Sequence, residues 1–120
     1  MADNRSLEFF LLRYVPSRIT DEFVNIGLVL LELSASGRSV IDARFTSNWQ
    51  RVQALDPNAD LDLLHAVAHD ISERLTNGNP EEMLQQMDDS FSNTIQLSSR
   101  FEYCSNSPKQ DIEALVAKYL

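Results

Sequence analysis

The stretch Asp21–Leu33, which reads DEFVNIGLVLLEL, decides the fold of this chain. A polar entry and an Asn-Ile-Gly step lead into an apolar run that Glu32 closes. A strand with one wet face alternates apolar and polar residues, whereas a strand buried on both faces reads as a continuous apolar run. The stretch therefore predicts an interior strand, and we expect the rest of the chain to be arranged around it.

A second apolar run comes before this one. Leu7–Val15 (LEFFLLRYV) is apolar on both parities and predicts another interior strand, which Pro16 ends because proline lacks a backbone donor. The connection Ser17–Asp21 is short enough to make the two strands an antiparallel hairpin. After a turn at Ser34–Arg38, in which a glycine takes positive φ, the alternating segment Ser39–Phe45 predicts a third strand with one wet face.

Strict alternation assigns each side chain of these strands to a face. In the second strand one face carries Val24, Ile26, Leu28 and Leu30, and the other carries Phe23, Gly27, Val29 and Leu31. In the third strand Ile41, Ala43 and Phe45 point inward, and Asp42 and Arg44 point outward. Because Gly27 weakens a buried strand, we expect a β-bulge there or the close approach of a covering helix.

Helical periodicity follows the third strand. Two helix starts have the Ser-x-x-Gln spacing of a capping box, Ser47–Gln50 and Ser107–Gln110, and the second has proline at the first helical position. A further helix is predicted to start at Asn79–Pro80, where a capping residue and a proline precede two acidic residues.

The longest predicted helix follows a break at Asp56–Pro57. Asn58 or Asp60 caps its first turn. Its apolar residues recur at helical spacing and form one stripe: Leu61, Leu64, Val67, Ala68, Ile71 and Leu75. The stripe predicts that this helix packs on the sheet.

The last predicted strand is Thr94–Cys104 (TIQLSSRFEYC), an alternating segment at the sheet edge. Its apolar face comprises Ile95, Leu97, Phe101 and Tyr103. The element order is therefore βββ, ααα, βα. Strands that do not alternate with helices form mostly antiparallel sheets. We predict an α+β fold, one domain over residues 1–120, with a largely antiparallel four-stranded sheet covered by helices.

The charge balance limits the class of partner. Acidic residues outnumber basic ones by 18 to 10, giving a formal net charge of −8. This charge repels a phosphate backbone and favours a basic protein surface, so direct nucleic-acid binding is not expected. The longest wholly apolar run, Leu28–Leu31, is far shorter than the ~20 residues that cross a membrane, and the N-terminal residues do not resemble a signal peptide. We expect a cytoplasmic protein with no membrane partner.

Three side chains have the spacing of metal ligands on one helix, Asp62, His65 and His69. The helical period places them opposite the apolar stripe and no fourth ligand accompanies them, which favours a solvated polar face over a metal site. Cys104 is the sole cysteine, and an inert thiol is favoured over a nucleophile. The sequence predicts no catalytic residue, no metal and no cofactor.

The candidate binding residues are polar groups beside the first hairpin and at the helix junction: Arg13, Glu22, Asn25, Asp56 and Asp60. A charge buried beside apolar strands must be paired. In the structural interpretation, Arg13 forms an ion pair with Glu22 while Asn25 satisfies loop backbone. In the functional interpretation, these residues form the polar floor of a small-molecule or peptide cleft. The structural interpretation is favoured.

Three segments together resemble one family: RYVPSRITDEFVNIGLVLLE, VQALDPNADLDLL and SPKQDIEALVAKYL. In order and spacing they are similar to the bacterial proteins grouped as domain of unknown function 3037. The matching positions are Arg13, Val15, Pro16, Glu22, Asn25, Gly27, Leu55, Asp56, Pro57, Ala59 and Asp60. That family has no established activity, but its genes often neighbour one for a HipA-like kinase, the toxin class of bacterial toxin and antitoxin pairs. The resemblance implies a small acidic accessory subunit.

Three hypotheses on function follow. The first is a non-catalytic accessory or antitoxin-like partner of a HipA-like kinase, binding through an exposed sheet edge or helix face. The second is a small enzyme or ligand-binding domain with a polar cleft near Arg13, Glu22 and Asn25. The third is a homodimeric structural domain in which the edge strand Thr94–Cys104 pairs with its twin. We favour them in that order.

Overall fold

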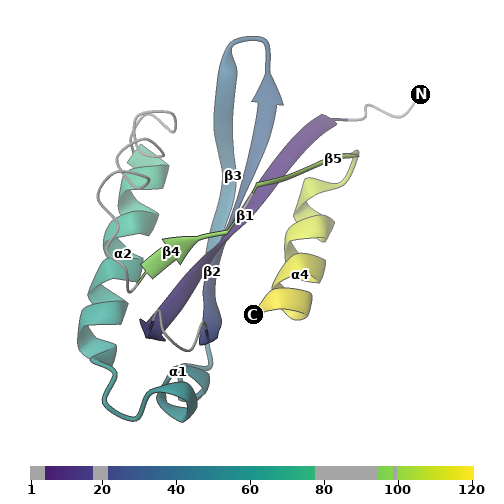
Figure 1. Ribbon diagram of the computed structural model, residues 1–120. Helices are drawn as coiled ribbons and strands as arrows, with labels where there is room; N and C mark the ends of the chain where they lie inside the picture. Colours follow the sequence, from purple (N-terminus) through teal and green to yellow (C-terminus); the bar gives the residue numbers. More distant parts are fainter. Residues whose placement is uncertain (1–4, 18–21, 78–94, 99) are drawn as a thin grey trace.

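Two long antiparallel strands run through the middle of the molecule (Figure 1). The structure is a computed structural model that describes residues 5–17, 22–77, 95–98 and 100–120. Strand β1 (Arg5–Ser17) pairs with β2 (Glu22–Ser34), and β3 (Gly37–Phe45) extends the sheet beyond β2. On the other side of β1 lie β4 (Ile95–Leu97) and β5 (Phe101–Ser105), both antiparallel to it. The predicted interior strands and their hairpin pairing are confirmed, although β1 continues through Pro16.

Helices lie on both faces of the sheet (Figure 1). Helices α1 (Gln50–Leu55) and α2 (Leu61–Asn77) cover one face, and α4 (Pro108–Tyr119) lies on the other. The α2-side core consists of Phe10, Leu12, Tyr14, Val24, Ile26, Val29, Leu31, Val52, Leu64, Ile71, Leu75 and Ile95. The α4-side core consists of Leu7, Phe9, Leu11, Leu28, Leu30 and Ile112. The predicted stripe of α2 is confirmed, because its members are buried or packed on the α2-side core, with Ala68 also buried.

A β-bulge in β2 changes the predicted face assignments. Leu12 pairs with Gly27 and the next residue, Arg13, pairs with Asn25, so Ile26 is an extra residue. Ile26 and the glycine after it therefore point to the same side. The predicted faces are wrong for this reason: Val24 and Ile26 share the α2-side core with Val29 and Leu31, while Leu28 and Leu30 belong to the α4-side core.

Gly27 lies where this bulge meets tight packing. A Cβ at this position would lie 2.8 Å from Cε1 of Phe45 and 2.9 Å from Cδ1 of Leu12. Both distances are well below the optimal separation of ~3.5–4.0 Å between carbon atoms. The predicted bulge is confirmed, and the close approach comes from the two neighbouring strands rather than from a covering helix.

A second irregularity lies in β3. Leu30 and Leu31 are partnered by Asp42 and Val40, which leaves Ile41 as an extra residue between them. Ile41 packs against the α4-side core, whereas the two inward residues that follow it pack against the α2-side core. The prediction that all three share one face is wrong, because the bulge shifts the alternation by one residue.

The predicted fourth strand is split in two. Leu12 pairs with Leu97 whereas Phe9 pairs with Phe101, so the second segment has one more residue than β1 over the same span. The extra residue turns β5 over relative to β4: Leu97 packs on the α2-side core and Tyr103 on the α4-side core. The predicted single face of this segment is therefore wrong. The described sheet has five strands rather than four, and the α+β class is confirmed.

Ser98 hydrogen-bonds the backbone of β1 at the break between β4 and β5. Its N–H donates to the carbonyl oxygen of Leu11 at 2.9 Å, and its hydroxyl accepts a hydrogen bond from the N–H of Leu11 at 2.8 Å. Ser98 is buried, so the hydroxyl replaces a backbone acceptor that the interrupted ladder does not supply.

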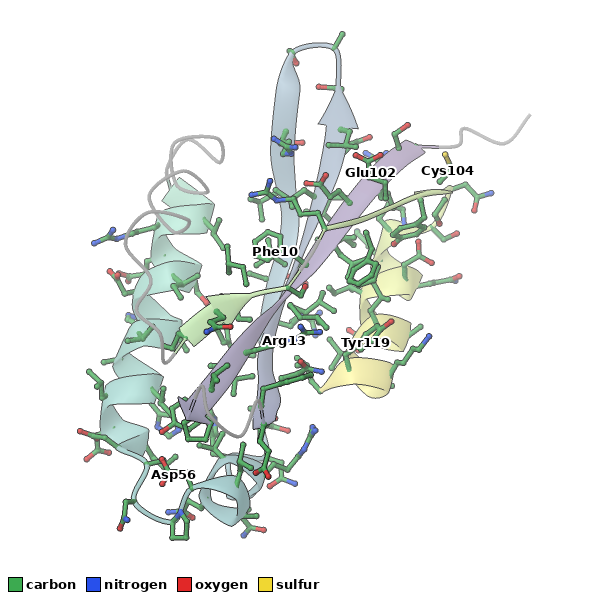
Figure 2. All side chains as sticks on the ribbon, viewed as in Figure 1. Phe10, Arg13, Asp56, Glu102, Cys104 and Tyr119 are labelled. Atoms are coloured by element: carbon green, nitrogen blue, oxygen red, sulfur yellow. The ribbon has the colours of Figure 1, made fainter. Side chains whose placement is uncertain are left out.

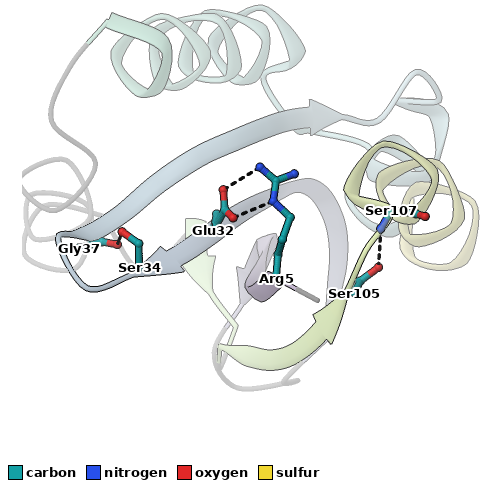
Figure 3. Close-up of polar contacts among 6 residues, drawn as sticks. All are labelled: Arg5, Glu32, Ser34, Gly37, Ser105 and Ser107. Atoms are coloured by element: carbon teal, nitrogen blue, oxygen red, sulfur yellow. Dashed lines mark hydrogen bonds and ion pairs between the residues drawn. The ribbon is translucent and has the colours of Figure 1, made fainter. Parts of the chain in front are cut away.

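The β2–β3 hairpin has the predicted glycine. Gly37 has φ 122°, and the Ser34 hydroxyl donates to its carbonyl oxygen at 3.0 Å (Figure 3). Nearby, the Arg5 guanidinium forms a two-pronged ion pair with Glu32 across β1 and β2, at 2.8 and 3.1 Å (Figure 3). This pair ties the first residue of β1 to the interior strand.

The helix caps match the predictions in part. The carboxylate of Asp60 accepts a hydrogen bond from the N–H of Leu63 at 3.0 Å, so the predicted cap of α2 is confirmed. Neither capping box forms its side-chain bond: the N-cap of α1 is Trp49 rather than Ser47, and Ser107 makes no side-chain cap bond. Ser107 is nevertheless the N-cap of α4, and proline begins that helix as predicted. The helix predicted from Asn79–Pro80 lies outside the described residues. None of the helices in the described segments is long and apolar enough to cross a membrane.

Candidate functional site

The first group of predicted binding residues holds the end of α4. The Nε of Arg13 donates to Oδ1 of Asn25 at 3.3 Å, and the Nδ2 of Asn25 donates to the carbonyl oxygen of Tyr119 at 3.3 Å. The guanidinium of Arg13 also lies 4.3 Å from the ring centroid of Phe23, which is close enough for a cation–π contact. Figure 2 shows Arg13 and Tyr119 beside the C-terminal end of α4. The predicted ion pair with the exposed Glu22 is wrong, since Asn25 and Phe23 take its place.

The second group fixes the junction between α1 and α2. The Tyr14 hydroxyl donates to Oδ2 of Asp56 at 2.7 Å, and Oδ1 of Asp56 accepts from the N–H of Asn58 at 3.1 Å. Burial raises the pKa of Tyr14 to about 12, and the hydrogen bond and negative charge of Asp56 add to the effect. Asp60 caps α2. The two aspartates therefore already have partners within the fold.

These contacts divide the predicted site. Arg13 and Asn25 secure α4, whereas Asp56 and Asp60 secure α1 and α2 at the end of the sheet marked by Asp56 in Figure 2. Neither of the two hollows described below includes any of the five predicted residues. The functional interpretation of these residues loses support, because most of them serve packing and capping contacts.

The residues with metal-ligand spacing lie on the solvent side of α2. Asp62, His65 and His69 are all exposed. The Nε2 of His69 lies 3.2 Å from Oε1 of Glu73, one turn later, and the ring of His65 lies edge-on to Trp49 with centroids 4.7 Å apart. In the part of the chain that the structure describes, no three His, Cys, Asp or Glu side chains are placed to share a metal ion.

One hollow among the described residues lies between β5 and α4. We call it the aromatic groove; its volume is about 330 Å³. It is lined by Phe9, Phe101, Tyr103, Asp111, Ala114, Leu115, Lys118 and Tyr119. Phe9 is at its centre, stacked on Phe101 with centroids 5.1 Å apart and within 6.0 Å of the rings of Tyr103 and Tyr119. Phe101 keeps 44% of its surface exposed, so an apolar face of the groove remains open to solvent.

Two charged groups border the aromatic groove. The Tyr103 hydroxyl donates to Oδ2 of Asp111 at 3.3 Å. Burial raises the pKa of Tyr103 to about 12, assisted by the charge and hydrogen bond of Asp111. The Nζ of Lys118 lies 5.3 Å from the ring centroid of Tyr119. The groove therefore combines aromatic faces with one acid and one base, which suits a side chain with an apolar body and a polar end.

A second hollow, of about 370 Å³, flanks α4 on the β3 side. Arg44 dominates it and bridges two acids, Asp42 at 2.7 Å and Glu113 at 3.0 Å. The hydrogen bond to Asp42 raises the pKa of Arg44 above its ordinary value. Since Arg44 is already paired with both acids, this hollow is better explained as a contact that holds α4 against β3 than as a ligand site.

Sequence reasoning missed the aromatic groove. Strict alternation places Phe101 and Tyr103 on the same face as Ile95 and Leu97, which hides their convergence with Phe9 and α4. The signal that could have found the groove is the pair of serines at positions 98 and 99 in the middle of an alternating strand, a place where a bulge reverses the faces.

Comparison with known proteins gives one match. A family model described as "Protein of unknown function (DUF3037)" matches residues 9–120, nearly the whole chain. No curated protein and no solved structure matches the chain.

Proposed function

We propose that this chain, which belongs to the DUF3037 family, is a non-catalytic interaction subunit. It binds a protein partner through the aromatic groove. The observation that carries the proposal is the exposure of Phe101, 44% of whose surface is open to solvent above the buried ring of Phe9. Aromatic side chains in such half-open apolar positions are enriched in the centres of protein interfaces. A partner side chain inserted there would bury both rings.

The arrangement of polar residues supports the same role. Four of the five candidates for a chemical site, Arg13, Asn25, Asp56 and Asp60, are engaged in contacts that hold helices on the sheet, and the fifth, Glu22, is exposed. Side chains that already make these structural contacts are poorly placed to take part in catalysis as well. Binding a protein partner does not require free catalytic groups, because it needs only a complementary surface.

A HipA-like kinase is the candidate partner. The net charge of −8 suits a partner with a basic docking surface, and electrostatic attraction of this kind speeds association. On this proposal the chain is an accessory or antitoxin-like subunit that acts in the cytoplasm. A complex with a HipA-like kinase of the same host is the specific expectation.

The test is co-expression of the tagged chain with that kinase, followed by affinity purification and gel filtration. We expect a stable stoichiometric complex with the unchanged chain and its loss with Phe101→Ser. Leu63→Ser on α2 is the matched control, since Leu63 is 59% exposed and lies outside the groove. This control should leave the complex intact. If the unchanged chain does not retain the kinase, the partnership is wrong.

A third variant separates the groove from the Arg13 cluster. Phe23 is 46% exposed and contacts Arg13, so Phe23→Ser removes the exposed apolar group of that cluster. We expect this variant to bind like the unchanged chain. Loss of the complex with Phe23→Ser but not with Phe101→Ser would transfer the binding role to the residues predicted from sequence, Arg13, Glu22 and Asn25.

A further inference from the structure

The outer edge of β5 is open in the described structure. β5 pairs with β1 through the register from Arg5↔Ser105 to Phe9↔Phe101, and no other described strand pairs with it. In an antiparallel ladder alternate residues direct their N–H and C=O groups to each neighbour. The residues of β5 that do not bond β1 therefore present backbone donors and acceptors outward, as a template for another strand.

The two faces of this edge differ in chemistry. Phe101 and Tyr103 line the aromatic groove on the α4 side. Glu102 and Cys104 alternate with them and are both exposed (Figure 2). A strand added beside β5 would thus lay one set of its side chains over the groove and the other set beside Glu102.

Glu102 gives this second face a negative charge. It lies directly opposite Glu8 of β1, whose carboxylate is only 2% exposed. Glu8 is compensated by Arg38 at 3.0 Å and by Arg100 at 4.0 Å. Glu102 takes part in no ion pair among the described residues. Like charges on facing positions of neighbouring strands are unfavourable, so a cation placed beside Glu102 would stabilise the edge.

We propose that β5 accepts an extended basic segment of a partner protein as an additional strand, with apolar side chains over the aromatic groove and a Lys or Arg beside Glu102. This inference rests on the proposed function and names the chemistry of the docking segment. Backbone hydrogen bonds supply affinity, and the alternation of apolar and basic residues supplies specificity. The recognised pattern is apolar, basic, apolar in consecutive positions.

A second copy of the chain fits this edge less well than a basic segment. Each copy carries a net charge of −8, so two copies repel one another. The β5 sequence FEYCS also contains no basic residue to place beside Glu102. The partner is therefore expected to differ from the chain itself.

The probe is a nine-residue peptide, Ser-Val-Thr-Val-Arg-Val-Thr-Val-Ser, blocked at both ends. Two N-methylated forms test strand addition, one methylated at peptide positions three, five and seven, the other at positions four and six. Only alternate N–H groups face β5, so one form should lose at least about tenfold in affinity and the other should bind within about twofold of the parent. Calorimetry or fluorescence anisotropy with the full chain measures both. Equal effects of the two forms, or no binding of the parent, would overturn strand addition.

A charge exchange tests the position of the cation. We expect Glu102→Lys to lower the affinity for the arginine peptide by about fivefold, because a cross-strand pair contributes up to ~1 kcal/mol. The same variant should bind a peptide with Glu in place of Arg more tightly than the unchanged chain does. Glu73→Lys on α2 is the control with the same change of charge and should have no such effect. If Glu102→Lys and Glu73→Lys behave alike, the assignment of the cation to Glu102 is wrong.

Two outcomes separate this inference from the proposed function. If the kinase co-purifies but the peptide does not bind, strand addition is overturned while the accessory role stands. If the peptide binds in the expected pattern and the kinase does not co-purify, the proposed partnership fails while the β5 edge remains a docking site. A doubled mass by light scattering, abolished by Glu102→Lys or by the peptide, would show that a second copy takes the edge and would overturn the basic segment.

Discussion

The two faces of the sheet are covered to different depths. On one face α1 and the 17-residue helix α2 close over the larger core, whereas on the other the 12-residue helix α4 lies over a smaller core and leaves the aromatic groove beside it. The same strands supply both faces, since alternate residues of β1 point to opposite sides. The difference indicates that the α2 face carries more of the core, while the α4 face leaves apolar surface open to solvent, as the proposed binding role requires.

Matched truncations of phenylalanine on the two faces give the largest contrast. Phe10→Ala removes a fully buried ring from the α2-side core and should lower the free energy of unfolding by about 3–5 kcal/mol. Phe101→Ala removes a half-exposed ring whose stacking on Phe9 is worth about 0.5–1.5 kcal/mol. Urea denaturation followed by circular dichroism measures both. Equal losses would mean that the α4 face is as structural as the other.

The bulge in β2 gives the next largest effect. Gly27→Ala places a Cβ 2.8 Å from Phe45 and 2.9 Å from Leu12, an overpacking that should cost about 1–3 kcal/mol. Phe45→Leu removes the nearer obstacle, so the double variant should be less destabilised than the sum of the two single variants. A double-mutant cycle in urea measures this coupling. Additive effects would show that Leu12 or the backbone, and not Phe45, sets the need for glycine.

The break between β4 and β5 is tested by Ser98→Ala. The change leaves the buried N–H of Leu11 without the hydroxyl acceptor at 2.8 Å, which should cost about 1–3 kcal/mol. Ser34→Ala in the exposed β2–β3 turn is the control and should change stability by less than about 0.5 kcal/mol. If the two variants are equally stable, Ser98 does not fix the reversal of faces on which the aromatic groove depends.

These bulges also explain how far the sequence could predict the structure. Apolar run length located β1 and β2, alternation located β3, and helical periodicity located α2, because each pattern follows directly from the geometry of its element. Alternation failed at Ile26, Ile41 and the segment around Ser98. One extra residue at each of these places moves the later side chains of the strand to the opposite face of the sheet. The extra residue can be identified only from the register with the neighbouring strand.

The candidate site was less predictable for the same reason. The sequence groups Arg13, Glu22 and Asn25 at the hairpin, but the partner of Arg13 is Asn25 rather than Glu22, a choice made by side-chain geometry. The aromatic groove joins Phe9 to residues more than ninety positions later, and it exists only because the third bulge turns β5 toward α4. Apart from the two serines at positions 98 and 99, long-range convergence of this kind leaves no local signal in the sequence.

Two tyrosines offer the finest comparison of the two faces. Tyr14 donates to Asp56 on the α2 side and Tyr103 donates to Asp111 on the α4 side, and burial raises the pKa of each from 10.0 to about 12. Between these values the unfolded chain loses its tyrosine protons before the folded chain does. The stabilisation is therefore complete below pH 10 and is lost as the pH rises toward 12.

We expect the urea midpoint to fall between pH 10 and 11.5, with a slope that Tyr14→Phe and Tyr103→Phe each reduce. At pH 8 each variant should lose about 0.5–1.5 kcal/mol, the value of one hydrogen bond. Because the two tyrosines lie on opposite faces and share no partner, the slopes removed by the two changes should add in the double variant. A slope that responds to Tyr14→Phe alone would mean that the Tyr103–Asp111 hydrogen bond is not formed in solution. The α4 face would then be less ordered than the α2 face at its polar contacts as well as less tightly packed.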